Sequence, residues 1–424
     1  MATPLTAPAT NESLARKGLR PAAGRILLCI VVLESSLLAS GRMLQIGPFT
    51  IKMLLFSLAL LYAAWSLLSW DRICRSTVLF ELSFVALLCL SALNGFCHAA
   101  DIRLIGGDLS PLSAFLILPF FELTIRNQAD IRLVMRIILT SACIVACCYA
   151  LIVVLLWLSL WLGLTSLGAL HRWLATSGGV DFFIGGDETG ETGHFFYTGS
   201  LYLVIGIIFL AFGNGRREKV AAFFLFLTLF LVASRGLFLA LALLAIFYVL
   251  IGPMPPIRKV GLGAVLLVLA ATSLPFLFVL SGDKSWSDTQ RLNTLSQVSE
   301  RITPLSTIVG HGFGVGVPEK PEHMEIIYLE IFHKQGAIGL LWWTALIVAL
   351  TLRFRQAMRN HGERLAYPLF LSAIVILVES GTNPFLNNPV GMYPFLISFV
   401  GLGVLARTAT QSSSTNANLG LRTA

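Results

Sequence analysis

Five ionisable side chains stand out in this sequence because one of them interrupts an apolar run and the other four lie in a single loop that is expected on the same side. An arginine in the middle of a lipid-exposed helix is costly, so such a residue marks either the end of a membrane helix or a site. Guanidinium groups present a planar fork of donors to phosphate oxygens, and a carboxylate or an imidazole can act as general base toward a hydroxyl group. The five residues are Arg235, Arg291, Arg301, His323 and Glu325.

The composition places these residues in a membrane protein. Hydrophobic residues make up 56% of the chain and charged residues only 12%, which is about half the charged share of a soluble domain. The net charge of +8 comes from basic residues in small groups between apolar runs, as in the flanks of membrane helices, and this distribution argues against nucleic acid as a partner. We expect an all-α integral membrane protein.

Hydropathy predicts about twelve transmembrane helices, because a bilayer core of about 30 Å needs roughly 17 to 25 helical residues. Two long loops on the outer face of the membrane are expected, at about residues 165–198 and 281–325. The expected spans are Ile26–Ser40, Ile51–Trp70, Val78–Ala92, Leu112–Leu123, Ile137–Leu164, Ser200–Phe212, Val220–Ala233, Leu237–Ile251, Val260–Leu280, Ile326–Leu352, Tyr367–Val378 and Met392–Ala406.

Lysine and arginine collect on alternate connections, as the positive-inside rule requires, which predicts that both termini are cytoplasmic. Residues 1–23 are then a disordered cytoplasmic tail, residues 24–407 a single polytopic membrane domain, and residues 408–424 a cytoplasmic C-terminal tail. The alternation holds only if the apolar run Val220–Ile251 is divided near Arg235. Arg235 then lies on the outer face, either in a site or as an interfacial arginine.

The first long loop reads GGVDFFIGGDETGETGHFF and is rich in glycine and acidic residues. This density predicts a mobile loop that faces sugar. A calcium-binding loop is an alternative, although the ligand spacing of an EF-hand is absent. The cysteines show neither a disulfide framework nor the paired spacing of a zinc site. No metal and no cofactor are therefore expected.

The second long loop carries most of the candidate site. Arg291 and Arg301 lie in a segment whose apolar residues have helical spacing, which predicts a helix along the membrane interface. The following GHGFGVG lacks the strand and the Lys-Ser/Thr of a phosphate loop and is interpreted as a flexible turn that lets backbone approach a ligand. Glu325 is expected to open the tenth span, where a carboxylate also gains from the helix dipole.

Three stretches, taken in this order, resemble the O-antigen ligase and O-antigen polymerase group of bacterial membrane glycosyltransferases. They are Ser234–Gly236, an arginine ahead of the glycine-rich turn Gly310–Gly314, and Glu325–Leu340. Members of that group use a sugar chain carried on undecaprenyl diphosphate at the periplasmic face of the inner membrane. The resemblance implies a glycan donor and acceptor of this kind as partners, together with membrane lipid, a chain-length regulator and a flippase.

The same resemblance assigns roles to Arg235 and Arg291, and the charge and position of the other three candidate residues extend this hypothesis to them. Arg235 and Arg291 would contact the lipid diphosphate, with Arg301 beside them, and Glu325, assisted by His323, would take the proton from the acceptor hydroxyl. No metal is needed if arginines stabilise the leaving group.

The chain departs from the ligase pattern at one position. Ligases typically have His-Asn eleven positions before the glycine that corresponds to Gly336, where this chain has Glu325, and His323 comes two residues earlier. This difference favours a polymerase of exopolysaccharide or O-antigen repeat units. A ligase that uses a lipid A core acceptor remains an alternative.

Other polar residues leave further alternatives open. Glu34 and Glu81 fall within expected spans, which would favour a transporter or flippase, although each can also hydrogen-bond a neighbouring helix. Glu330 and Lys334 are spaced as a helix-stabilising pair, so a structural role is favoured. The loop Glu379–Gly391 carries Asn and Glu groups that could bind sugar hydroxyls, and turn chemistry explains its Asn-Pro equally well.

Overall fold

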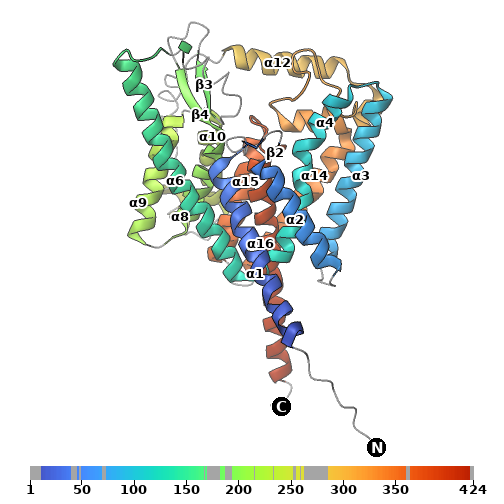
Figure 1. Cartoon of the computed structure of the whole chain (residues 1–424), viewed down its shortest axis with the longest axis vertical. Helices are drawn as coiled ribbons and strands as arrows, with labels where there is room; N and C mark the ends of the chain where they lie inside the picture. Colours follow the sequence, from blue (N-terminus) through green and yellow to red (C-terminus); the bar gives the residue numbers. More distant parts are fainter. Residues whose placement is uncertain are drawn as a thin grey trace, which may run out of the picture.

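The computed structural model of the chain is a bundle of α-helices with two short antiparallel hairpins (Figure 1). The hairpins pair β1 (Gln45–Ile46) with β2 (Phe49–Thr50) and β3 (Phe182–Gly186) with β4 (Gly193–Tyr197). The structure describes residues 11–39, 45–46, 49–68, 73–166, 168–169, 182–186, 193–213, 215–232, 234–251, 255–257, 259–261, 285–359 and 363–420.

Seven helical segments among the described residues are long and apolar enough to cross a membrane, as a multi-pass membrane protein requires. One of them, Ile102–Thr124, is built from α4 (Ile102–Leu112), a 3-10 turn (Ser113–Ile117) and α5 (Leu118–Thr124). The others lie in α1 (Asn11–Leu38), α2 (Ile51–Leu68), α3 (Arg75–Cys97), α6 (Gln128–Trp161), α14 (Ile327–Arg359) and α16 (Pro389–Gly420).

Four shorter helices occupy further expected spans. Among the described residues, seven helical segments meet the length and hydropathy of a membrane span, fewer than the twelve expected. The run Val220–Ile251 is divided between α9 and α10, with Arg235 at the first position of α10. Most of the expected span Val260–Leu280 lies outside the described residues. The four helices are α8 (Leu201–Ala211), α9 (Arg216–Val232), α10 (Arg235–Ile251) and α15 (Glu363–Glu379).

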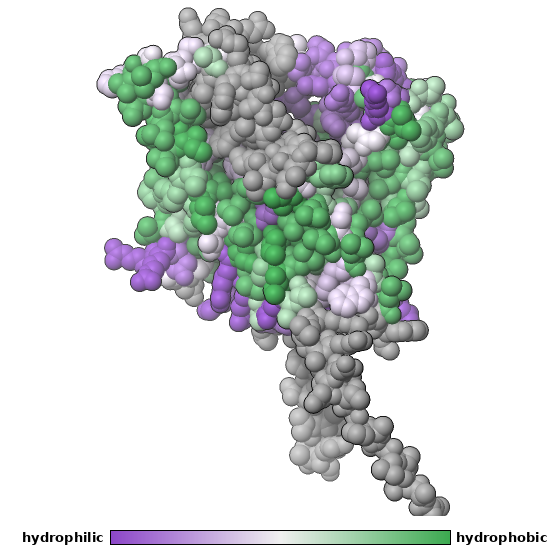
Figure 2. All heavy atoms as spheres, in the orientation of Figure 1, coloured by the Kyte–Doolittle hydropathy of each residue, from purple (hydrophilic) through white to green (hydrophobic). Residues whose placement is uncertain are grey.

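The centre of the bundle is α16. In its apolar segment 94% of the residues are buried, whereas in the other candidate spans 22% to 50% of the residues are buried. Those other spans therefore have faces left for lipid. The chain's hydrophobic residues form a broad band, and hydrophilic residues gather at both ends of that band (Figure 2).

The helix α12 (Ser285–Glu300) crosses the end of the bundle opposite the two termini (Figure 1). Leu292 and Leu295 on this helix are 66% and 50% exposed, while Val298 is buried. This placement agrees with the expected helix along the interface.

Both expected tails are helical for part of their length, since α1 begins at Asn11 and α16 continues to Gly420. The first long loop contains the β3–β4 hairpin, which the prediction of a mobile loop did not include. Its acidic residues Asp181, Asp187, Glu188 and Glu191 lie outside the described residues.

The prediction of an unbroken tenth span needs a correction, because α14 is interrupted at Gly336. This glycine has φ 66° and ψ −161°, which is not helical. A Cβ atom there would lie 2.3 Å from the carbonyl oxygen of Ile308, so only glycine fits beside that backbone. Glu325 lies in a bend two residues before α14 and does not open the helix as expected.

Candidate functional site

The glycine-rich turn locks the interrupted helix α14 to α3. The amides of His311 and Gly312 donate to the carbonyl oxygens of His333 and Lys334, which the break in α14 exposes, and the amide of Phe313 donates to Ser91. Gly314 donates its amide to the Asp108 carboxylate at 2.7 Å. These amides already have protein partners, so the turn is a structural joint and does not present its backbone to a ligand as expected.

Beside this joint four side chains form a buried ionic group, here called the Asp108 cluster: Asp108, His323, Glu330 and Lys334. The Lys334 ammonium donates to Asp108 at 2.7 Å, to Glu330 at 2.6 Å and to the carbonyl oxygen of Glu322 at 2.7 Å. His323 Nδ1 lies 3.3 Å from Glu330 Oε1 and 3.4 Å from Asp108 Oδ1. One cation therefore holds two carboxylates, and an imidazole lies against both.

The Asp108 cluster carries an unbalanced charge when His323 is neutral. The side chains of Asp108, Glu330 and Lys334 are each no more than 4% exposed, whereas that of His323 is 43% exposed. Two carboxylates and one ammonium leave a net charge of about −1, which favours a positive or proton-donating neighbour. The hydrogen bond to Glu330 accordingly raises the pKa of His323 above its usual value.

A cavity of about 540 Å³ adjoins His323 and Glu330, a size typical of sites for small organic ligands. Its wall comes from the beginning of α2, the end of α4 with the 3-10 turn, and the loop between α15 and α16. The lining residues are Thr50, Lys52, Met53, Phe56, Gly107, Ser110, Pro111, Ser113, Ala114, His323, Glu330, Pro384, Asn387, Asn388, Pro389 and Tyr393.

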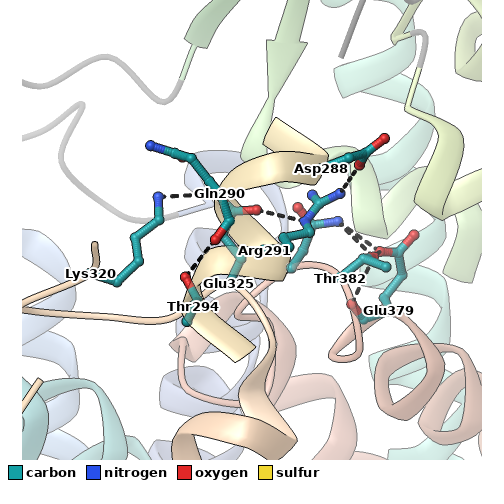
Figure 3. A network of polar contacts seen from close by, with 9 residues as sticks. Asp288, Gln290, Arg291, Thr294, Lys320, Glu325, Glu379 and Thr382 are labelled. Carbon is teal, nitrogen blue, oxygen red and sulfur yellow. Dashed lines mark hydrogen bonds and ion pairs between the residues drawn. The ribbon is translucent and has the colours of Figure 1, made fainter. Parts of the chain in front are cut away.

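Two of the predicted residues, Arg291 and Glu325, meet directly. Arg291 on α12 donates through Nε to Glu325 Oε2 at 2.9 Å, and Lys320 Nζ lies 3.2 Å from Glu325 Oε1 (Figure 3). Arg291 also reaches Asp288 at 3.1 Å. Both carboxylate oxygens of Glu325 are thus engaged by cations.

The other predicted residues lie in three places. Arg235 begins α10, and its neighbour Gly236 lies so close to Glu379 that a Cβ atom would be 2.9 Å from both carboxylate oxygens. Glu379 precedes Ser380, whose carbonyl oxygen accepts from the amide of Ile327. The approach of Gly236 to the Glu379 side chain and the backbone bond of Ser380 to Ile327 thus connect the segment of Arg235 to the beginning of α14, near Glu325.

Arg301 lies farther along the second loop. It is exposed, and its Nη1 donates to the carbonyl oxygen of Gly316 at 2.8 Å. His323 belongs to the Asp108 cluster, so the five predicted residues do not form one compact group. Within the described part of the chain, Arg291 and Glu325 are the predicted residues that form an ion pair with each other.

The sequence interpretation missed Asp108 and gave Lys334 a purely local role. Asp108 and Lys334 are 226 positions apart, and no spacing rule connects residues at that separation. An aspartate within an apolar run is nevertheless a signal in itself, because a charged group at membrane depth needs a partner.

The Asp108 cluster has the donor types of a metal site. Ligand atoms of Asp108, His323 and Glu330 all lie within 4.8 Å of one another. The Lys334 ammonium, however, already lies between the two carboxylates. A divalent cation would have to displace it, so the donor set fits a built-in cation better than a metal.

In comparisons with known proteins, no protein-family model matches the chain, and no curated protein matches it. The resemblance stated above therefore rests on the quoted residues alone.

Proposed function

We propose that the protein is a bacterial inner-membrane glycosyltransferase that polymerises repeat units carried on undecaprenyl diphosphate. The reaction would take place at the periplasmic face, on the side of α12, with both termini in the cytoplasm. The observation that carries this proposal is the position of His323, whose ring lies between a carboxylate pair and a cavity of ligand size.

His323 fits the role of general base better than Glu325. Its Nδ1 faces Glu330 and Asp108, and no hydrogen bond joins its Nε2 to any residue that the structure describes. A carboxylate that holds one ring nitrogen fixes the orientation of an imidazole whose other nitrogen accepts a proton. Glu325, by contrast, is occupied by Arg291 and Lys320.

The proposed step is a displacement at the anomeric carbon of the donor. His323 Nε2 takes the proton of an acceptor hydroxyl while the oxygen of that hydroxyl bonds to the anomeric carbon. The bond from the anomeric carbon to the diphosphate oxygen breaks, and the electron pair leaves with the polyprenyl diphosphate. Arg291 and Lys320 would stabilise the added negative charge, since preorganised cations act where charge develops.

The test uses purified protein in liposomes with radiolabelled lipid-diphosphate repeat units. Wild-type protein is expected to form polymer, and His323→Ala to lose roughly 10²-fold or more of the rate, as expected when a general base is removed. His98, an exposed histidine that bonds Asn94, supplies the control His98→Ala, which should polymerise normally. No polymer from wild-type protein, or equal rates for all three proteins, would refute the proposal.

A transporter or flippase is the second candidate, and one observation favours it. Charged side chains lie inside candidate spans, where Asp108 and Glu330 hold Lys334, and Lys52 lies 4.0 Å from Glu34. The same liposomes distinguish the two candidates, because a flippase would move labelled lipid across the bilayer without forming polymer. A ligase would transfer the label only when a lipid A core acceptor is supplied.

A further inference from the structure

We infer that the cavity beside His323 binds the acceptor saccharide, a neutral polyhydroxy ligand, and that the donor diphosphate binds separately at Arg291 and Lys320. This inference rests on the proposed function and assigns its two substrates to different places. The evidence is the chemistry of the cavity wall and the distribution of cations around it.

Neutral hydroxyl and amide groups supply much of the polar part of the wall. Such groups both donate and accept hydrogen bonds, as the hydroxyl groups of a sugar do. Apolar contacts from Met53 and Phe56 complete the mixture usual for small-molecule sites. The polar groups are Thr50, Ser110, Ser113, Asn387, Asn388 and Tyr393.

The charges at the cavity disfavour a diphosphate. Glu330 lines it and shares the net negative charge that the Asp108 cluster carries when His323 is neutral, the form in which this histidine acts as a base, so a phosphate group there would face a carboxylate. Lys52, the one lysine or arginine of the lining, donates to the carbonyl oxygen of Ala39 and lies near Glu34. A ligand without charge avoids the repulsion and can still bond to Glu330.

Cations are concentrated instead around Glu325. Arg291 on α12 contacts one of its carboxylate oxygens, and Lys320, which follows the glycine-rich turn, contacts the other. A diphosphate offers the same oxygen chemistry as this carboxylate and can replace it between the two cations. Glu325 is only two residues from His323, so the two substrates would meet at this loop.

Two adjacent glycines on α4 allow a matched test. A Cβ atom at Gly106 or Gly107 would meet nothing within 4 Å, and both are exposed, but only Gly107 lines the cavity. Ser110 lies one helical turn after Gly107 and also lines it. Gly107→Trp and Ser110→Phe should therefore fill the cavity, whereas Gly106→Trp adds the same bulk outside it.

The experiment measures KM for two substrates that can each act in one role only. An alkyl glycoside of the repeat unit has no diphosphate and can only accept, and a lipid-diphosphate repeat unit that lacks its acceptor hydroxyl can only donate. Gly107→Trp and Ser110→Phe should raise KM for the acceptor at least about tenfold and change KM for the donor by less than about twofold. Gly106→Trp should match wild type, and Arg291→Lys should raise KM for the donor.

The outcomes separate the inference from the function on which it rests. If wild-type protein transfers the label but both cavity variants keep a normal KM for the acceptor, the inference is wrong and the function stands. An increase in the donor KM instead would place the diphosphate in the cavity and also overturn it. If wild-type protein transfers nothing, the proposed function fails.

Discussion

His323 is the residue at which electrostatics and proposed chemistry meet. Its ring is held by Glu330, with Asp108 close by, and the bond to Glu330 favours the protonated form. The raised pKa has two opposite consequences. The contact with Glu330 stabilises the fold most at low pH and weakens as the pH rises through the raised pKa, whereas a general base acts only when it is neutral.

We therefore predict an acidic limb in the pH dependence of polymerisation, with its midpoint above the ordinary histidine pKa of about 6.5. Glu330→Gln should shift this midpoint to lower pH, because the hydrogen bond that raises the pKa is weakened. Initial rates between about pH 5 and pH 9 measure it. A limb that stays in place in Glu330→Gln would show that another group titrates.

Lys334 is expected to be necessary for folding. Lys334→Met leaves two buried carboxylates without their cation and should lower the free energy of unfolding by about 3–5 kcal/mol. Thermal unfolding in detergent measures this loss. The triple variant with Asp108→Asn and Glu330→Gln removes the stranded charges and should regain much of the stability; failure to do so would contradict a purely electrostatic cause.

The role of Arg235 depends on the geometry of its guanidinium. If it contacts the diphosphate as the resemblance implies, Arg235→Lys should lose most polymerisation although the charge is kept, since an ammonium cannot form paired contacts with phosphate. Normal rates with this variant, measured in the liposome assay, would rule out that contact.

Among the elements, the hydrogen-bonded joint between the glycine-rich turn, α3 and α14 determines where the site lies. It joins the carbonyl groups freed at Gly336 to the turn and directs one amide to Asp108. The pattern GHGFGVG is explained by these close backbone approaches. Gly312 has φ 90°, and a Cβ atom there would lie 2.1 Å from the amide nitrogen of Gly95.

Gly312→Ala should therefore destabilise the protein by more than about 1 kcal/mol, because both the positive φ and the contact with Gly95 exclude a side chain. The control Gly106→Ala lies in α4 with open space around it and should be neutral or stabilising. Thermal unfolding in detergent compares the two variants. Equal stability would mean that the turn can move away from α3.

On the scale of the whole molecule, the proposed orientation exposes one end of the bundle to the periplasm and the other end to the cytoplasm. The end with α12 carries the candidate site and lies opposite the end with both termini (Figure 1). Arg25 of α1 pairs with Asp130, and Arg407 of α16 pairs with Glu122. Arginines at the terminal end agree with the positive-inside rule.

This orientation can be tested with cysteines at the two ends. In a variant whose seven native cysteines are replaced by serine, Asp288→Cys should react with an impermeant thiol reagent added outside spheroplasts. Arg359→Cys should react only after the membrane is permeabilised. The reverse pattern would invert the topology and place the candidate site in the cytoplasm.

The positions of many helices could be predicted from the sequence, because hydropathy and charge are local properties that determine which segments enter a membrane and how they are oriented. The membrane class, the division of Val220–Ile251 near Arg235, and a helix that carries Arg291 were predicted in this way and recur in the structure. The break at Gly336 was not predicted, because it depends on the backbone of Ile308 and Gly310, which lie in another segment.

The constitution of the site was decided by tertiary structure alone. Asp108 and Lys334 are 226 positions apart and meet only because the glycine-rich turn packs between α3 and α14. The sequence predicted that His323 and Glu325 act together as the base. In the structure His323 contacts the Glu330 carboxylate and lines the cavity, whereas Glu325 contacts two cations, Arg291 and Lys320. Side-chain partners of this kind arise from contacts between distant segments, and no periodicity along a single segment encodes them.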